Sequence, residues 1–229
     1  MLVVGFPAGA FHANCYLLAP GPGGGCVVVD PGQDALPGVA DALREHRLTP
    51  AAVLATHGHV DHVHSAAELA DAHRVPVWIR PEDRPLLSDP LKGLGPDLAG
   101  ALGDLRLTEP ARVAELGEGE LELAGLRVEV LHTPGHTPGS AVFRLATEEG
   151  GQLALTGDTV FAGSVGRTDL PGGDPRELGT SLRRMMAALP DDTVLLPGHG
   201  GTSTVGREKA TNPFLGGGTG PTGGTRGRS

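Results

Sequence analysis

The residues best suited to chemistry in this sequence are the histidines and the aspartate of residues 56–62, which read THGHVDH. Four candidate metal ligands fall within six residues: His57, His59, Asp61 and His62. Neutral imidazoles suit zinc and iron, and carboxylates suit harder ions, so this mixed set fits Zn²⁺, Fe²⁺ or Mn²⁺. Side chains so close in sequence reach one ion, or two adjacent ions, only if the backbone bends into a loop. We therefore expect a metal site at this position.

Three further candidate ligands stand alone at wide spacing: His136, Asp158 and His199. The full set contains no cysteine, which argues against a closed structural zinc site. It also exceeds the four ligands that one zinc ion usually takes. The economical arrangement is two ions about 3.5–4 Å apart that share a carboxylate and a hydroxide. Such a centre supplies a nucleophile at neutral pH.

Each candidate ligand follows a predicted strand. Apolar runs at residues 51–55, 126–131, 152–155 and 193–196 precede, in that order, the segment 57–62, His136, Asp158 and His199. In layered α/β proteins, functional residues gather in loops at one end of the sheet. A glycine adjoins each of the three isolated ligands (Gly135, Gly157, Gly198) and allows a sharp turn or a close approach. Four loops from four strands can therefore converge on one point.

The N-terminal part of the chain predicts strands that alternate with helices. In chain order we expect strands at 2–4, 15–19 and 26–29, a helix at 35–47, the strand at 51–55, a helix at 65–73 and a strand at 75–79. Ser65 and Glu68 form a capping box that opens the second helix. This alternation is typical of a layered α/β fold.

Three later segments have patterns of their own. Residues 85–110 are rich in Gly, Pro, Leu and Asp, which predicts a long loop with short helical turns, and such loops are often lids. Asp174 as N-cap and Pro175 at the first helical position predict a helix over 175–189. Residues 216–229 are rich in Gly and Thr and contain no hydrophobic side chain, so we expect a disordered tail.

Composition narrows the class of protein. The 229 residues show no linker, and their formal charge of −9 argues against nucleic acid or an anionic membrane as the main partner. The sequence has no basic N-terminal region ahead of an apolar stretch and no apolar run of about 18 residues, so we expect a cytoplasmic protein. Cys15 and Cys26 lie in strand-like runs and are expected to be buried thiols; a hairpin disulfide is the alternative.

Four segments together resemble the metallo-β-lactamase superfamily: THGHVDH at 56–62, TPGHTPG at 133–139, TGDT at 156–159 and LPGHG at 196–200. Two more, FAGSVGRTDLPGGD at 161–174 and REKATNPFL at 207–215, resemble its glyoxalase II (hydroxyacylglutathione hydrolase) branch, particularly the short single-domain members. The resemblance implies an α/β fold, an αββα four-layer sandwich of two mixed sheets with outer helices. It implies one hydrolase domain over residues 1–215, with the site at an edge between the sheets.

Carried onto this sequence, the resemblance implies two divalent metal ions, with zinc as the first choice and iron or manganese as alternatives. One ion would sit on His57, His59 and His136 and the second on Asp61, His62 and His199, with Asp158 bridging the two. The implied reaction is hydrolysis of a thioester, such as an S-2-hydroxyacyl-thiol, to a hydroxy acid and a free thiol. A metal-bound hydroxide, oriented by Asp61, attacks the carbonyl and a thiolate leaves.

Residues around this ligand set are predicted to support it or to bind substrate. Asp30 ends the 26–29 run and is expected to anchor a ligand histidine. Arg167 is expected either to touch an anionic substrate or to brace its loop through an ion pair with Asp169. Arg207 and Lys209 are expected to bind a carboxylate or to form a solvated helix face.

The thiol half of the expected small-molecule substrate stays open. Full-length glyoxalase II enzymes add a C-terminal helical domain that supplies much of the glutathione-binding surface, whereas 30 residues follow His199 here. The resemblance therefore supports the hydrolytic core and leaves open the thiol carrier, glutathione or another, and the oligomeric state. The five remaining histidines are interpreted as structural or surface residues: His12, His46, His64, His73 and His132.

Four other functions of related proteins, and a non-catalytic role, compete with hydrolysis of a thioester. Persulfide dioxygenases resemble this chain and use a single iron on the equivalents of His57, His136 and Asp158. β-Lactamase activity is disfavoured by Asp158, because those enzymes use no bridging carboxylate there. Nuclease relatives need a basic surface and extra domains or arms, and diiron oxygen reductases need a carboxylate where His59 stands. A non-catalytic binding module is disfavoured by the complete ligand set.

Overall fold

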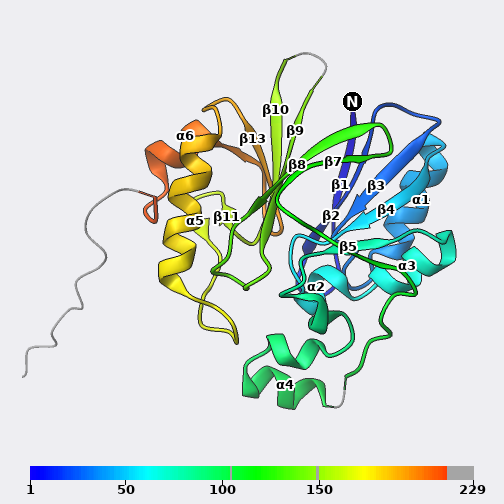
Figure 1. Cartoon of the computed structure of the whole chain (residues 1–229), viewed down its shortest axis with the longest axis horizontal. Helices are drawn as coiled ribbons and strands as arrows, with labels where there is room; N and C mark the ends of the chain where they lie inside the picture. The colour runs from blue at the N-terminus through cyan, green and yellow to red at the C-terminus, as the bar shows by residue number, and fades with distance from the viewer. Residues whose placement is uncertain (104, 148–149, 216–229) are drawn as a thin grey trace, which may run out of the picture.

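Two six-stranded sheets dominate the computed structural model, which describes residues 1–103, 105–147 and 150–215 (Figure 1). The predicted tail, residues 216–229, lies outside the described residues. The first sheet has the order β1-β2-β3-β4-β5-β6. Its strands are β1 (Leu2–Ala8), β2 (Ala13–Ala19), β3 (Gly25–Val29), β4 (Thr49–Leu54), β5 (Val77–Ile79) and β6 (Val113–Glu115). Pairing is antiparallel from β1 to β3 and parallel from β3 to β6, so the sheet is mixed.

The second sheet is also mixed and has the order β14-β13-β10-β9-β8-β7. Its strands are β7 (Gly119–Leu123), β8 (Leu126–His132), β9 (Ala141–Ala146), β10 (Gln152–Gly157), β13 (Val194–Pro197) and β14 (Ser203–Thr204). β10 and β13 pair in parallel, and the other neighbours pair antiparallel. A small hairpin of β11 (Val160–Phe161) and β12 (Ser164–Val165) follows β10.

Alternating side chains of the central strands separate the interior into layers. In β2, Leu18 packs between the two sheets, whereas Leu17 packs on the outer face of the first sheet. The neighbours across the inter-sheet layer include Val128 of β8 and Phe143 of β9. Because both faces are covered, all seven residues of β2 are buried.

Helices cover the outer face of each sheet, which completes the predicted αββα sandwich. The helices α1 (Leu36–His46) and α3 (Ala66–His73) pack on the first sheet, and α5 (Pro175–Ala188) packs on the second (Figure 1). A short α6 (Val205–Thr211) follows β14 beside α5 (Figure 1). The α/β fold class and its four layers are therefore confirmed.

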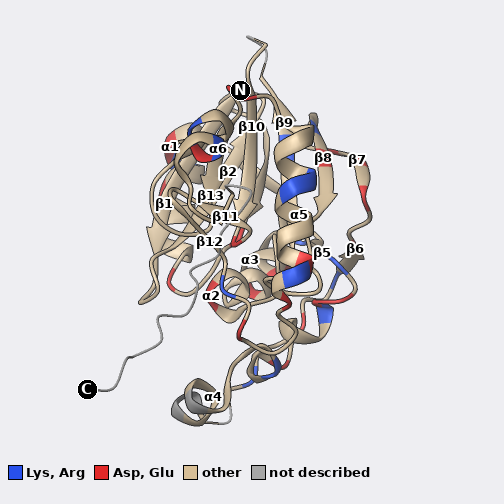
Figure 2. Cartoon of the chain, turned by 90° about the vertical axis from the view of Figure 1, so that its left-hand side faces the viewer, with Lys and Arg blue, Asp and Glu red and all other residues tan. Residues whose placement is uncertain are grey.

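The helix α5 shows how local sequence determines one of these layers. Asp174 caps it by accepting hydrogen bonds from the backbone N–H groups of Arg176 at 2.7 Å and Glu177 at 3.1 Å. Its buried face carries Leu178, Leu182 and Met185 at helical spacing. Its basic residues Arg176, Arg183 and Arg184 are exposed, and basic positions are blue on the ribbon of α5 in Figure 2.

Two expectations about local structure had different outcomes. The helix predicted from residue 65 exists as α3, but the capping box does not form. Ser65 Oγ donates a hydrogen bond to the carbonyl of Gly32 at 2.7 Å and makes no cap to its own helix. The 3₁₀ turn η1 (Arg84–Leu87) overlaps the start of the segment 85–110, which also contains the 3₁₀ turn η2 (Pro90–Gly93) and the helix α4 (Pro96–Leu102), in line with short helical turns.

The cysteines behave as buried thiols, as predicted. Cys15 and Cys26 are free, and burial raises the pKa of both thiols. Within the described ranges, every helix is too short or too polar to cross a bilayer.

Candidate metal centre

The seven predicted ligands gather at one end of the sandwich, where loops from both sheets meet. The first four belong to the segment after β4, which includes the short helix α2 (Val60–Val63). His136 lies between β8 and β9, Asp158 between β10 and β11, and His199 after β13. Figure 1 shows α2 at this end, below the strands and above α4.

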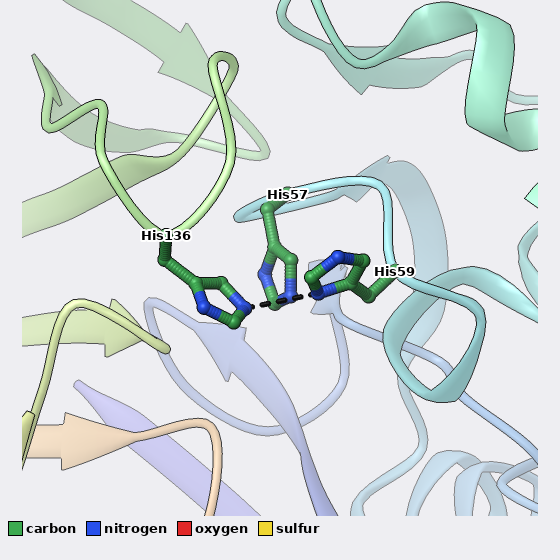
Figure 3. Close-up of side chains that lie close together, drawn as sticks. All are labelled: His57, His59 and His136. Carbon is green, nitrogen blue, oxygen red and sulfur yellow. Dashed lines mark hydrogen bonds between the residues drawn. The ribbon is translucent and has the colours of Figure 1, made fainter. Parts of the chain in front are cut away.

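The first group of ligand atoms consists of three buried histidines. His57, His59 and His136 offer nitrogens that all lie within 4.8 Å of one another. His59 Nδ1 lies 2.9 Å from His136 Nε2, and the three rings converge from two facing loops (Figure 3). Burial, reinforced by the neighbouring His136, lowers the pKa of His59 to about 3, and burial likewise lowers the pKa of His57. Both rings are therefore neutral and offer lone pairs.

The second group consists of Asp61, His62 and His199, whose ligand atoms also lie within 4.8 Å of one another. His199 Nε2 lies 3.2 Å from both His62 Nε2 and Asp61 Oδ2. Burial opposes protonation of His62, but the carboxylates of Asp61 and Asp158 raise its pKa to about 10. A cation, whether a proton or a metal ion, is thus strongly favoured among these carboxylates.

Asp158 lies between the two groups. Its Oδ1 is 3.4 Å from His62 Nε2, and its Oδ2 is 3.5 Å from His136 Nε2 and 3.6 Å from His199 Nε2. One carboxylate therefore faces histidines of both groups. This is the position expected of the predicted bridging residue.

Outer hydrogen bonds orient the ligand histidines. His136 Nδ1 donates to the carbonyl of Arg167 at 2.8 Å, and His199 Nδ1 donates to the carbonyl of Phe11 at 3.1 Å. Because a carbonyl only accepts, these contacts place the proton on Nδ1 and leave Nε2 with its lone pair. His62 Nδ1 makes the corresponding contact with Asp30 Oδ2 at 3.0 Å, which is the contact expected of Asp30.

His57 is oriented through a relay. Thr56 Oγ1 donates to Asp30 Oδ2 at 2.6 Å and therefore accepts from His57 Nδ1 at 3.1 Å. His57 Nε2 is thereby left as an acceptor that points inward. His57 Nε2 and Asp158 Oδ1 are both buried without a hydrogen-bond partner among the described residues. Leaving buried acceptor atoms unpaired is costly. A bound divalent cation would supply the missing partner, and this set of histidine nitrogens and carboxylate oxygens suits such ions.

Glycines let these loops come together, as the sequence suggested. Gly135 and Gly157 adopt φ values of 132° and 46°, which disfavour other residues. Gly198 serves a close approach: a Cβ atom there would lie 2.2 Å from Asp158 Oδ1. The backbone beside His199 can therefore pass the bridging carboxylate only without a side chain.

A cavity of about 370 Å³ opens onto the ligand cluster and contains one of the three predicted substrate residues. Its apolar lining is Phe11, Val60, Leu94, Leu98, Phe161, Val165 and Leu170. Arg167 also lines it and forms a two-pronged ion pair with Asp169, both bonds at 2.7 Å. Arg207 and Lys209 are not part of this lining, and Lys209 pairs instead with Asp191 at 2.7 Å. The cavity thus combines an apolar wall with a single tethered cation.

Sequence reasoning missed Asp83 and the individual residues of the cavity wall. Asp83 is fully buried and binds both loops of the three-histidine group, but it stands in a charged, surface-like run, RPEDR at 80–84. Leu94 and Leu98 come from the segment 85–110, whose composition suggested a lid without indicating which side chains face the site.

Two relatives of known sequence extend over nearly the whole chain. An uncharacterised protein of Mycobacterium tuberculosis is 47% identical over 219 residues, which cover 94% of this chain and 98% of that protein. The hydroxyacylglutathione hydrolase GloC of Haemophilus influenzae is 37% identical over 215 residues, which cover 91% and 95%.

Solved structures agree with the fold. BLEG-1, a B3 metallo-β-lactamase, matches with a TM-score of 0.83 and 33% identity, covering 94% of this chain and 100% of that one. TTHA1623 in a di-iron-bound form matches with a TM-score of 0.75 and 39% identity, covering 93% and 100%. ETHE1 from Myxococcus xanthus matches with a TM-score of 0.74 and 25% identity, covering 93% and 84%.

The family model for the metallo-beta-lactamase superfamily matches residues 8–199. This span begins at the last residue of β1 and ends at His199, the last candidate ligand. The chain belongs to the metallo-β-lactamase superfamily.

Proposed function

We propose that this protein is a metal-dependent hydrolase that cleaves small-molecule thioesters of the S-2-hydroxyacyl type to a hydroxy acid and a free thiol. The observation that carries the proposal is the position of Asp158, whose two oxygens face histidines of both ligand groups. That arrangement suits two ions sharing a carboxylate better than one ion on three residues. The likeness to the hydroxyacylglutathione hydrolase GloC supports the choice of substrate class.

His57, His59 and His136 would hold one ion. Asp61, His62 and His199 would hold the other, with Asp158 between the two groups. Zinc is the first choice, with iron or manganese as alternatives, and a di-iron form is known for TTHA1623. When bound, divalent ions supply Lewis acidity and a nucleophilic water near neutral pH.

Protein side chains would orient the reactants around these ions. Asp61 presents a carboxylate oxygen beside His199 at the edge of the cavity, where it would accept a hydrogen bond from the attacking water. The oxygen of that water forms the new C–O bond, the C–S bond breaks, and a proton passes to the departing sulfur. Leu94 and Leu98 in the cavity wall would keep bulk water away from the carbonyl.

A thioester panel tests the proposal. Protein loaded separately with Zn²⁺, Fe²⁺ or Mn²⁺ is assayed for thiol release from S-lactoylglutathione and from the same acyl group on other thiols, with metal content measured on each sample. We expect hydrolysis at about two ions per chain and its loss in His59→Ala. His73→Ala, an exposed histidine in the last turn of α3, is the matched control and should keep full activity.

Competing activities are measured on the same samples. A cephalosporin is included because BLEG-1 is a B3 metallo-β-lactamase, and oxygen uptake on glutathione persulfide tests for a dioxygenase. Hydrolysis of the cephalosporin alone would overturn the proposal. So would oxygen uptake by protein that carries one iron and hydrolyses no thioester.

A further inference from the structure

Asp83 is a buried carboxylate that none of the expected roles uses. It follows β5 in the turn before η1, and its side chain is fully buried. The hydrogen bonds that it accepts in the described chain all come from neutral donors. Burying a carboxylate is costly unless its oxygens accept hydrogen bonds. These three hydrogen bonds therefore offset the cost of burying Asp83.

The donors come from the two loops that carry the three-histidine group. Asp83 Oδ2 accepts from Gly58 N at 2.8 Å and from Thr137 Oγ1 at 2.7 Å, and Oδ1 accepts from Gly139 N at 2.8 Å. Gly58 separates His57 from His59, and Thr137 directly follows His136. One carboxylate therefore binds the loop after β4 and the loop after β8, which belong to different sheets.

Close packing reinforces this link. A Cβ atom on Gly139 would lie 2.6 Å from Asp83 Cγ, and one on Gly58 would lie 2.9 Å from the Asp83 carbonyl oxygen. Both loops thus lie against Asp83 at distances that only glycine permits. The facing loops in Figure 3, which bring His136 toward His57 and His59, are the ones that Asp83 joins.

We propose that Asp83 is a positioning residue for the three-histidine group. By holding the two loops together it fixes the separation of His136 from His57 and His59, and thereby the affinity of that group for its ion. It makes no hydrogen bond or ion pair with Asp61, His62 or His199 among the described contacts, so the second group should be insensitive to it. The inference concerns metal binding and holds whichever substrate the enzyme takes.

The chain offers a matched control for the loss of a buried carboxylate. Glu208 is also buried and also accepts three hydrogen bonds, from Gly163 N, Ser203 Oγ and Asn212 Nδ2. None of these donors adjoins a candidate ligand in the sequence. Glu208→Gln therefore imposes a similar structural disturbance without touching the ligand loops.

The experiment measures Zn²⁺ dissociation constants by competition with a chromophoric chelator. Each variant is made in two backgrounds: His199→Ala, which disables the second group, and His136→Ala, which disables the first. We expect Asp83→Asn to weaken Zn²⁺ binding by about 10- to 100-fold in the His199→Ala background, the range typical of residues that orient metal ligands. In the His136→Ala background, Asp83→Asn should change the Zn²⁺ dissociation constant by no more than about threefold.

Thr137 provides a second test that leaves Asp83 in place. Thr137→Val removes one hydrogen bond to Asp83 Oδ2, whereas Thr137→Ser keeps the hydroxyl. We expect Thr137→Val to weaken Zn²⁺ binding to the first group and Thr137→Ser to bind Zn²⁺ as the parent protein does. This comparison remains valid if Asp83→Asn fails to fold. Unchanged affinity in Thr137→Val and Asp83→Asn would overturn the proposal. So would equal losses in both backgrounds that Glu208→Gln reproduces.

Discussion

His62 Nδ1 lies 3.0 Å from Asp30 Oδ2, and both side chains are almost completely buried. The same carboxylate also accepts from the backbone N–H and the hydroxyl of Thr56, at 2.7 and 2.6 Å. Through Thr56 it orients His57, so Asp30 connects one histidine of each ligand group. Its φ of 51° places it in the left-handed region, which aspartate tolerates better than most residues.

Replacing Asp30 should affect both stability and metal binding. In Asp30→Asn one oxygen becomes an NH₂ group that faces donors, so at least one buried donor loses its acceptor. We expect the free energy of unfolding of the metal-free protein to fall by about 1–3 kcal/mol, and metal affinity to fall by about 10- to 100-fold. Urea denaturation and chelator competition measure the two effects.

Asp41→Asn is the control for this prediction, because Asp41 is exposed and its ion pair among the described residues is with Arg44 on the surface of α1. Surface ion pairs of this kind contribute about 0–1 kcal/mol. A loss of stability in Asp41→Asn equal to that in Asp30→Asn would contradict the role assigned to the buried carboxylate.

A methyl group at residue 198 should disrupt the junction between the ligand groups. The Cβ atom of Gly198→Ala would lie 2.2 Å from Asp158 Oδ1 and 2.7 Å from His62 Cε1, so the carboxylate or the loop must move. Displacements of about 1 Å at reacting groups cost about 10²-fold in rate. We expect such a loss of hydrolysis, with fewer than two ions retained. Gly201→Ala, where a Cβ meets nothing within 4 Å, should behave as wild type; equal loss in both would refute the steric argument.

The predicted role of Arg167 in substrate binding can be separated from its ion pair. Its pairing with Asp169 is largely exposed and lowers the pKa of Asp169 to about 2 through the guanidinium hydrogen bond. We expect Arg167→Gln to raise KM for thioesters that carry a carboxylate, with kcat little changed. Lys209→Gln, outside the cavity lining, should leave KM unchanged. Steady-state kinetics check both, and a KM equally raised for uncharged thioesters would argue for the bracing role instead.

The N-cap of α5 should contribute to stability without contributing to chemistry. Asp174→Ala removes the acceptor for the N–H groups of Arg176 and Glu177 and should cost about 1 kcal/mol of unfolding free energy. Asp174→Ser retains a capping oxygen and should recover most of that loss. Thermal or urea unfolding measures both variants; equal stability of Asp174→Ala and wild type would show that the cap contributes nothing.

The ligand loops could be predicted from sequence because each carries its own local pattern. A β-rich run, a glycine and a histidine or aspartate lie within a few residues of one another at His136, Asp158 and His199. Convergence then followed from the layered fold, in which strand ends share one edge. The αββα arrangement itself came from resemblance and was confirmed by the two mixed sheets.

Long-range partners explain what could not be predicted. Asp83 binds donors that are 25, 54 and 56 residues away, and nothing in its own surroundings indicates them. Ser65 failed as a cap because the carbonyl of Gly32, 33 residues earlier, takes its hydroxyl. The sequence of α6 does not show which of its faces packs inward. In the structure the side chain of Glu208 is buried, whereas Lys209 pairs with Asp191 at the surface.

The candidate ligands are divided between the sheets: four follow β4 of the first, and three follow strands of the second. Bound ions would thus cross-link the two halves of the sandwich at the end where the backbone N–H of Asn14 already donates a hydrogen bond to the carbonyl of Gly198 at 2.7 Å. Folding and metal uptake then become a single linked equilibrium. Each ion would stabilise the native state by about 2.7 kcal/mol at a free concentration 100-fold above its dissociation constant. The melting temperature of this protein would therefore report the free metal concentration of its surroundings.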